Sequence, residues 1–194
     1  MIDVRRVLLV GEVHGTKQSS KYVKKIIEAE GNKKVIICLE VLPQLKRDIT
    51  KFIRTETFTN KTLKWYFDSG YMNPDSVALL RSEMQHSALI ACVCQIKTDD
   101  AQYARNLLRT IKKYKNRTII LIAGRYHLRD DSKIYALLKS KNVHFERIFL
   151  LPTAGKFYNY GVRDISELDK FTVRAPAKII KIGKTSASYY AQFI

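Results

Sequence analysis

The chain has 194 residues, of which 46% are hydrophobic and 27% charged, the balance of a soluble globular domain with its own core. No apolar run approaches the roughly 20 residues of a membrane-spanning helix, and the run from Val7 to Val10 is too short for a secretory signal. We therefore expect no transmembrane segment and a cytoplasmic protein.

The formal net charge of +17 permits binding to nucleic acid, to an anionic membrane surface or to an acidic substrate, and does not choose among them. The lysines are scattered, and no helix-turn-helix, RNP-like or Cys/His finger sequence accompanies them. A generally basic surface with at most a weak anionic partner is the simpler interpretation. The three cysteines, Cys38, Cys92 and Cys94, are odd in number and lie in apolar runs, which predicts buried structural thiols.

In chain order, short apolar strands alternate with amphipathic helices. The patterns predict buried strands over 4–10, 35–39, 89–95, 118–123 and 145–150, and helices over 17–30, 43–54, 61–67, 75–85, 99–114 and 131–139. Thr16 is the predicted N-cap of the first helix. Because apolar strands separated by helices form sheets covered on both faces, we expect an α/β fold with a mostly parallel central sheet.

After Pro152 the pattern changes to short aromatic or β-branched segments separated by Gly and Pro. These segments predict antiparallel strands, or a hairpin, that complete an edge of the sheet. They cover 157–162, 171–173, 177–182 and 189–194. No linker divides the chain, so we expect a single domain over 1–194, with a helical insertion at about 43–86 and a C-terminal β edge at about 153–194. The polar turns of the insertion suggest a lid over the sheet.

Two Gly-x-x-His turns, at 11–14 and 124–127, each follow a predicted strand, and a glutamate follows another strand between them. Ligands of open parallel sheets gather beyond the carboxyl ends of the strands, so these side chains are expected to share one site. The candidate residues are Glu12, His14, Glu40, Arg125 and His127. Taken singly, a histidine after a strand usually caps or packs, and a glutamate there often caps the next helix. The repeated turn with an acid at a third strand end favours a functional site.

Four segments, VLLVGEVHGTKQS, VIICLEVLP, DDAQYARNLLRTI and RTIILIAGRYHL, resemble the superfamily of erythromycin esterases, ChaN-like haem-uptake proteins and TraB/Tiki proteins. The resemblance covers about residues 4–150. It implies that Glu12, His14, Glu40 and His127 correspond to the paired acids and histidines of the superfamily. The esterase branch has one more residue between its acid and its first histidine. An arginine of several members has no counterpart at Thr98-Asp99-Asp100.

This set of residues supports two mechanisms for cleaving an ester or amide bond, a reaction class that the resemblance implies. Without metal, His14 acts as a general base oriented by Glu40, and His127 or Arg125 stabilises the oxyanion. With metal, His14, Glu40 and His127 hold a divalent ion (Mn, Zn, Co or Fe), and the remaining glutamate activates its bound water.

Other residues have an ordinary structural interpretation beside a functional one. We expect His86 at an exposed helix end, His144 at the opposite end of the sheet, and Asp99 and Asp100 either capping a helix or adding an acid to the site. Trp65 and Tyr126 are expected to pack in the core rather than line a pocket. The sequence Gly183-Lys184-Thr185 lacks the first glycine of a phosphate-binding loop.

The preferred function is a hydrolase acting on a small-molecule or peptide substrate. One alternative is a non-catalytic module that binds haem or a metal, as ChaN-like relatives do. Another is a basic nucleic-acid-binding protein. The substrate, the metal and the oligomeric state stay open at this point.

Overall fold

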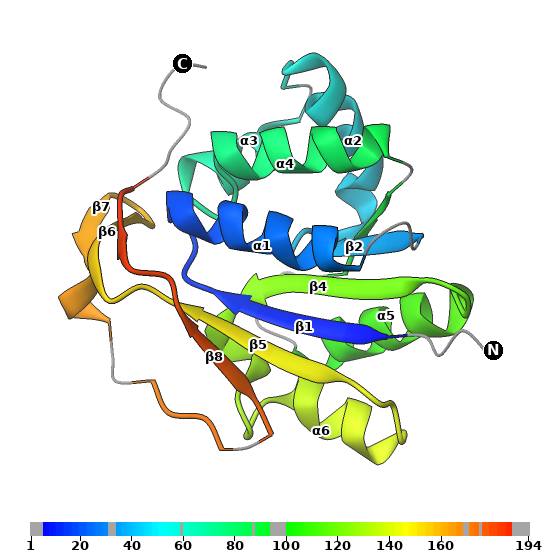
Figure 1. Cartoon of the computed structure of the whole chain (residues 1–194). Coiled ribbons are helices and arrows are strands. Elements are labelled where there is room, and N and C mark those ends of the chain that lie inside the picture. Colours follow the sequence, from blue (N-terminus) through cyan, green and yellow to red (C-terminus); the bar gives the residue numbers. More distant parts are fainter. Residues whose placement is uncertain are drawn as a thin grey trace.

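The structure is a computed structural model of the chain and describes residues 6–30, 34–58, 60–86, 88–93, 100–168, 171–174 and 176–187. Its central strands are β1 (Val7–Glu12), β2 (Val35–Leu39), β3 (Leu89–Cys92), β4 (Thr118–Gly124), β5 (Glu146–Leu151) and β8 (Lys178–Lys181). They form one six-stranded sheet in the order β3-β2-β4-β1-β5-β8, and every pair in it is parallel. The expected α/β fold with a parallel central sheet is confirmed (Figure 1).

Helices cover both faces of this sheet (Figure 1). The helices of the first face are α1 (Lys17–Ala29), α2 (Lys46–Thr55), α3 (Lys61–Asp68) and α4 (Pro74–Gln85); those of the second are α5 (Asp100–Lys113) and α6 (Lys133–Ser140). Successive strand residues alternate between the two cores: Leu8 and Val10 pack with the first group, and Val7 and Leu9 with the second. This two-sided burial explains why the strands are continuously apolar. The helices predicted for the insertion, α2 to α4, therefore form part of the first core.

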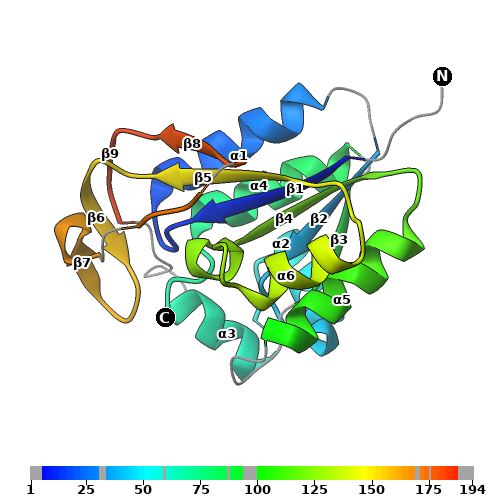
Figure 2. The ribbon, with the colours of Figure 1, turned by 90° about the horizontal axis from the view of Figure 1, so that it is seen from below.

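The carboxyl ends of the strands meet at one edge of the molecule. The arrowheads of β1, β5 and β8 point toward the same side, where a small sheet lies (Figure 2). That sheet contains β6 (Ala154–Tyr158), β7 (Val162–Asp164) and β9 (Lys184–Thr185), in the order β7-β6-β9. Strands β6 and β7 form the expected antiparallel hairpin. Its turn, however, falls inside the range predicted as one strand, 157–162.

Two other C-terminal predictions were wrong. The segment predicted at 177–182 was expected to be antiparallel, but β8 runs parallel to β5, with Ile148 opposite Lys178. From the small sheet the described part of the connection runs down past β8 in Figure 1, and β8 then turns back alongside β5 in the same direction. The segment 171–173 forms no strand; instead Phe171 packs its ring 5.0 Å from Phe149. The strand predicted at 189–194 lies outside the described residues, as does Cys94.

Thr16 precedes α1 as predicted, but its side chain does not cap the helix. The hydroxyl instead donates to the Val13 carbonyl (2.8 Å) and lies 2.5 Å from the Ser19 hydroxyl. Thr16 thereby stabilises the loop that carries His14, because its bond closes the turn just after β1. Thr16 therefore occupies the predicted N-cap position, but its hydroxyl donates to the loop carbonyl and accepts from no amide of the helix.

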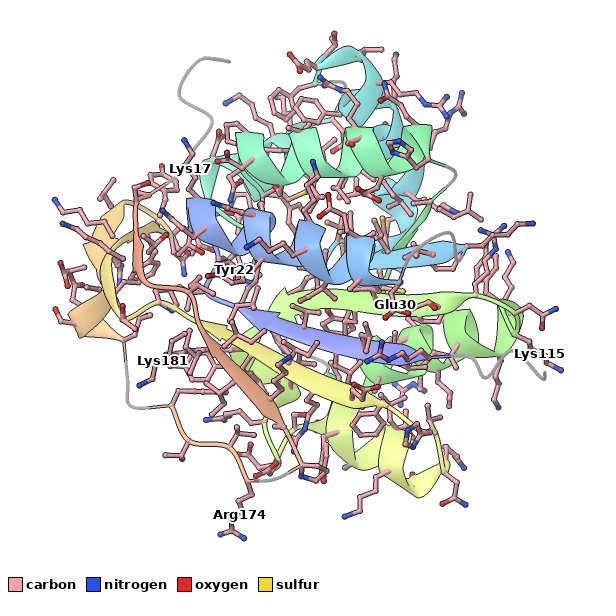
Figure 3. The ribbon with its side chains drawn as sticks, viewed as in Figure 1. Lys17, Tyr22, Glu30, Lys115, Arg174 and Lys181 are labelled. Carbon is pink, nitrogen blue, oxygen red and sulfur yellow. The ribbon has the colours of Figure 1, made fainter. Side chains whose placement is uncertain are left out.

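The basic side chains are spread around the molecule. Lys17, Lys115, Arg174 and Lys181 lie on different sides of it and are exposed (Figure 3). This distribution matches the expected generally basic surface. Within the described ranges, no helix combines the length and apolar character needed to cross a bilayer.

Candidate functional site

The predicted acids and histidines come together beyond the carboxyl ends of β1, β2 and β4. Glu12 is the last residue of β1 and lies opposite Gly124, the last residue of β4. Glu40 follows β2 directly, and His14 lies in the loop between β1 and α1. His127 lies in the short 3₁₀ turn Arg125–Leu128 that continues β4. Neighbouring parallel strands thus deliver all four side chains to one edge, as their positions in the sequence predict.

The four side chains contact one another in a continuous chain. His14 Nδ1 lies 3.3 Å from Glu12 Oε1, and His14 Nε2 lies 3.4 Å from Glu40 Oε2. His127 Nε2 lies 3.1 Å from Glu40 Oε1, so the Glu40 carboxylate bridges the two imidazoles. The backbone N–H of Gly124 also donates to Glu40 Oε2 at 2.7 Å, which fixes the carboxylate against β4.

Asp100 extends the chain by a fifth member. Its Oδ1 lies 2.8 Å from His127 Nδ1, and it is the first residue of α5. Of the two interpretations given to Asp100 from the sequence, the placement beside the histidine is the one that the structure shows. Asp99 lies outside the described residues. The complete chain is Glu12–His14–Glu40–His127–Asp100.

The contacts determine the charge of each group. Burial disfavours the imidazolium form of His14, but Glu40 and Glu12 outweigh it and raise its pKa to about 10. Burial likewise opposes the charge of His127, and its bonds to Glu40 and Asp100 still raise the pKa. Burial acts to raise the pKa of Glu40, yet the two histidines hold it well below its usual range. At neutral pH the His14 imidazole is therefore protonated, between the carboxyl groups of Glu12 and Glu40.

A small cavity opens beside this chain. It has a volume of about 40 Å³ and is lined by Glu12, His14, Glu40 and, from the turn between α3 and α4, Tyr71 and Met72. A water molecule needs roughly 10–15 Å³ of such space, so the cavity accommodates more than one. The helical insertion thus contributes a wall of the site.

Aromatic side chains flank the two histidines, and the sequence did not point to most of them. The ring centroid of Tyr71 lies 4.8 Å from that of His14, and Tyr103 lies 5.6 Å from His127. No spacing signal marks Tyr71, because it lies in a turn. Trp65 and Tyr126 were expected in the core, but they are 44% and 41% exposed, so that expectation was wrong. Trp65 lies on α3 and Tyr126 in the 3₁₀ turn after β4, and neither belongs to one of the two cores.

The glycines that open the two Gly-x-x-His turns serve packing rather than a sharp bend. Gly11 and Gly124 lie within β1 and β4, and neither has a positive φ. A Cβ at Gly124 would lie 2.8 Å from His14 Nε2. A Cβ at Gly11 would lie 2.7 Å from a ring carbon of Phe149. The absence of a side chain at Gly124 therefore makes the space that His14 occupies.

The remaining candidates lie elsewhere. The Arg125 guanidinium lies 4.9 Å from the ring centroids of both Tyr126 and Phe171 and donates to the Tyr126 hydroxyl (3.0 Å). These rings and the Tyr126 hydroxyl hold the guanidinium of Arg125 in position. His86 ends α4, where its Nδ1 lies 2.9 Å from the Ser82 carbonyl. His144 is exposed just before β5, at the amino ends of the strands.

The C-terminal hairpin fastens two loops of the site. The Tyr158 amide donates to the Gly15 carbonyl at 3.2 Å. Gly15 and Gly70 both have positive φ, and a Cβ at either position would lie 2.0 Å from the Tyr158 carbonyl oxygen. The backbone at Tyr158 therefore packs between the loop that carries His14 and the turn that carries Tyr71.

The expected divalent metal does not fit this arrangement. Within the part of the chain that the structure describes, no group of three His, Cys, Asp or Glu side chains is placed to hold a metal ion. Both nitrogens of His14 and both of His127 face carboxylate oxygens. In this arrangement the imidazoles serve the carboxylates rather than a common ion.

No family model matches the chain, and no curated protein matches its sequence. Solved structures resemble it. A succinoglycan biosynthesis protein has a TM-score of 0.57 at 9% identity, over 95% of this chain and 89% of that one. A protein from Bacillus cereus has a TM-score of 0.54 at 9% identity, over 97% and 91%. A structure described as bacterial protein toxins has a TM-score of 0.50 at 16% identity; 76% of this chain matches 34% of that one. Such low identities show a shared fold alone.

Proposed function

We propose that the chain is a hydrolase of ester or amide bonds that works by acid–base chemistry of its own side chains. The observation that carries the proposal is the continuous contact of Glu12, His14, Glu40, His127 and Asp100 beside a cavity large enough for water. The resemblance of the two Gly-x-x-His turns to erythromycin esterases, ChaN-like and TraB/Tiki proteins supports the same reaction class.

The charge states assign the proposed roles differently from the simplest expectation. A His14 whose pKa is raised to about 10 is protonated at neutral pH and is a poor general base. Glu40 engages one histidine with each oxygen and accepts from the Gly124 amide. Glu12 contacts His14 through Oε1 and lines the cavity, so its other oxygen is available to a water molecule there. Glu12 is therefore the proposed base, and His14 the acid.

The reaction balances with water as the only co-reactant. Glu12 takes a proton from water as the water oxygen attacks the carbonyl carbon. The bond to the leaving group then breaks, and the protonated His14 donates its proton to the departing oxygen or nitrogen. Exchange with solvent removes the proton from Glu12 and restores the one on His14. The positive charge of His14 stabilises the oxyanion electrostatically, while His127 and Asp100 position Glu40.

Hydrolysis of 4-nitrophenyl acetate and of an anilide by the purified chain tests the proposal. General acid–base groups contribute roughly 10²–10⁴-fold, so Glu12→Gln and His14→Ala should each lower kcat/KM by about 100-fold or more at a temperature where both variants are folded. His86→Ala, outside the site, is the matched control and should keep full activity. Turnover that survives in His14→Ala, or a wild-type chain that hydrolyses neither compound, contradicts the proposal.

Three further experiments distinguish the alternatives. Activity that disappears with EDTA and returns with Mn, Zn, Co or Fe would favour metal-assisted hydrolysis over the side-chain mechanism. A shifted Soret band on adding haem, without hydrolysis, would favour the ligand-binding module. Tight, salt-dependent binding of nucleic acid that survives loss of both histidines would favour the nucleic-acid-binding protein.

A further inference from the structure

A row of aromatic rings leads from the catalytic histidine to the surface. The ring of Tyr71 lies 4.8 Å from that of His14. Trp65 stacks on Tyr71 with centroids 5.6 Å apart and an angle of 30° between the planes. Tyr160 continues the row, 6.2 Å from Trp65. These separations are those of interacting aromatic pairs.

The inner end of the row lies in the site and the outer end in the open. Tyr71 is half-buried and lines the same cavity as His14. Trp65 is 44% exposed and Tyr160 61% exposed, although aromatic rings of this size are usually covered. Neighbouring apolar side chains left in the open beside a cavity are typical of a binding surface.

The row is held in place by backbone from distant parts of the chain. Trp65 belongs to α3, where its carbonyl accepts from both the amide and the hydroxyl of Ser69 (2.9 and 2.6 Å). Tyr160 lies in the turn between β6 and β7 with φ of 55°, a left-handed conformation that side chains rarely adopt. The contact of Tyr158 with Gly15 and Gly70 ties this turn to the loops of His14 and Tyr71. A strained, tethered aromatic residue at the outer end of this row points to a functional role.

We propose that Trp65, Tyr71 and Tyr160 form a stacking platform for a planar aromatic ring of the substrate. A flat ring gains from stacking on exposed rings, whereas a saturated ring of similar size lacks the π-face. The platform begins at His14, so a ring bound there places a neighbouring ester or amide group at the cavity. That placement rests on the proposed hydrolase, and ring binding itself does not. The substrate class is therefore an aryl ester or amide.

Trp65 is the only tryptophan of the chain and provides a direct readout. Its indole N–H gives one resonance in a ¹⁵N-correlated NMR spectrum. Adding 2-naphthoate, which the protein cannot hydrolyse, should shift this resonance in a saturable way. Cyclohexanecarboxylate, an anion without a π-face, should leave it unchanged. In Tyr160→Ala the Kd for 2-naphthoate should rise on the order of tenfold, since stacking on one aromatic residue contributes that much.

Ile179→Ala is the matched control, because Ile179 is 48% exposed on β8, away from the aromatic row. It should leave the Kd unchanged. An unshifted indole resonance, or an equal shift with cyclohexanecarboxylate, overturns the platform. So does a resonance that moves on dilution of the protein without ligand, since a second copy then covers the rings.

The NMR titration tests the platform, and the hydrolysis assay tests the hydrolase, so either proposal can fail without the other. A shifted indole in a chain that hydrolyses no ester supports the platform and contradicts the hydrolase. Hydrolysis of phenyl acetate and cyclohexyl acetate with equal kcat/KM, together with a silent indole, supports the hydrolase and overturns the platform.

Discussion

At the scale of single residues, Gly124 shows how closely the site is packed. A methyl group there would lie 2.8 Å from His14 Nε2 and 3.6 Å from Glu40 Oε2. We predict that Gly124→Ala lowers kcat/KM for 4-nitrophenyl acetate about 100-fold, because displacing a catalytic group by about 1 Å has effects of that order. The melting temperature should change little, since the imidazole lies at the end of a side chain that can rotate.

Gly11 is the matched control for this prediction. Its Cβ would lie 2.7 Å from Phe149 Cδ1 and 3.2 Å from the Cα of Arg125, and Phe149 is fully buried. Overpacking of this kind costs about 1–3 kcal/mol of folding free energy, so Gly11→Ala should unfold at lower urea. Equal losses of stability in the two variants, with activity following stability, would count against a role for Gly124 in the site.

At the level of helices and strands, the hairpin of β6 and β7 contacts the loops of the site. It packs the Tyr158 backbone between the loops of Gly15 and Gly70. Strand β9 pairs with β6 on the side away from β7. Lys17 N–H donates to the Ser186 carbonyl at 3.1 Å, which ties the residues after β9 to the start of α1. The C-terminal segment therefore supports the walls of the site.

A comparison of two glycines distinguishes the effect of this packing from the effect of backbone strain. Gly70 and Gly183 have nearly the same φ, 77° and 74°, but a Cβ at Gly70 meets the Tyr158 carbonyl while one at Gly183 meets nothing within 4 Å. We predict that Gly70→Ala destabilises the protein by about 1–3 kcal/mol more than Gly183→Ala, the cost of a forced steric overlap. Urea unfolding of both variants measures the difference. Equal destabilisation would mean that strain alone matters and that the hairpin does not fasten the turn.

At the scale of the whole molecule, the linked charges make stability depend on pH. The pKa of His14 is raised from 6.5 to about 10, so its contribution is complete below about pH 6.5 and is lost as the pH rises through 10. The pKa of Glu40 is lowered from 4.5, so its contribution is complete above about pH 4.5 and is lost as the pH falls through the lowered value. Both act together between these limits.

We predict that the difference in melting temperature between the wild type and Glu40→Gln is largest near pH 5–6. It should shrink above about pH 10 and also in strong acid. NMR titration of the His14 ring in Glu40→Gln should give a pKa below that of the wild type, because the main charge that raises it is gone. A difference in melting temperature that does not vary with pH would contradict the linkage.

The sequence alone determined the α/β class, because apolar strands of four to seven residues between amphipathic helices pack stably only in a covered parallel sheet. It also determined which strand ends carry Glu12, His14, Glu40 and His127, since parallel strands bring their carboxyl ends to one edge. The C-terminal segment after Pro152 was predicted less well. The direction of β8 depends on the path of the connecting chain, which the local pattern of Lys178 to Lys181 does not encode.

The contacts among the side chains of the site follow from tertiary packing and not from the sequence pattern. The bridge of Glu40 between the two histidines, the position of Asp100 and the approach of Tyr71 depend on the packing of five separate segments. The raised pKa values of the two histidines depend on that packing, because Glu40 and Asp100 are distant from them in the chain. The sequence thus determined which groups reach the sheet edge, whereas side-chain distances of about 3 Å decided which of them hold protons.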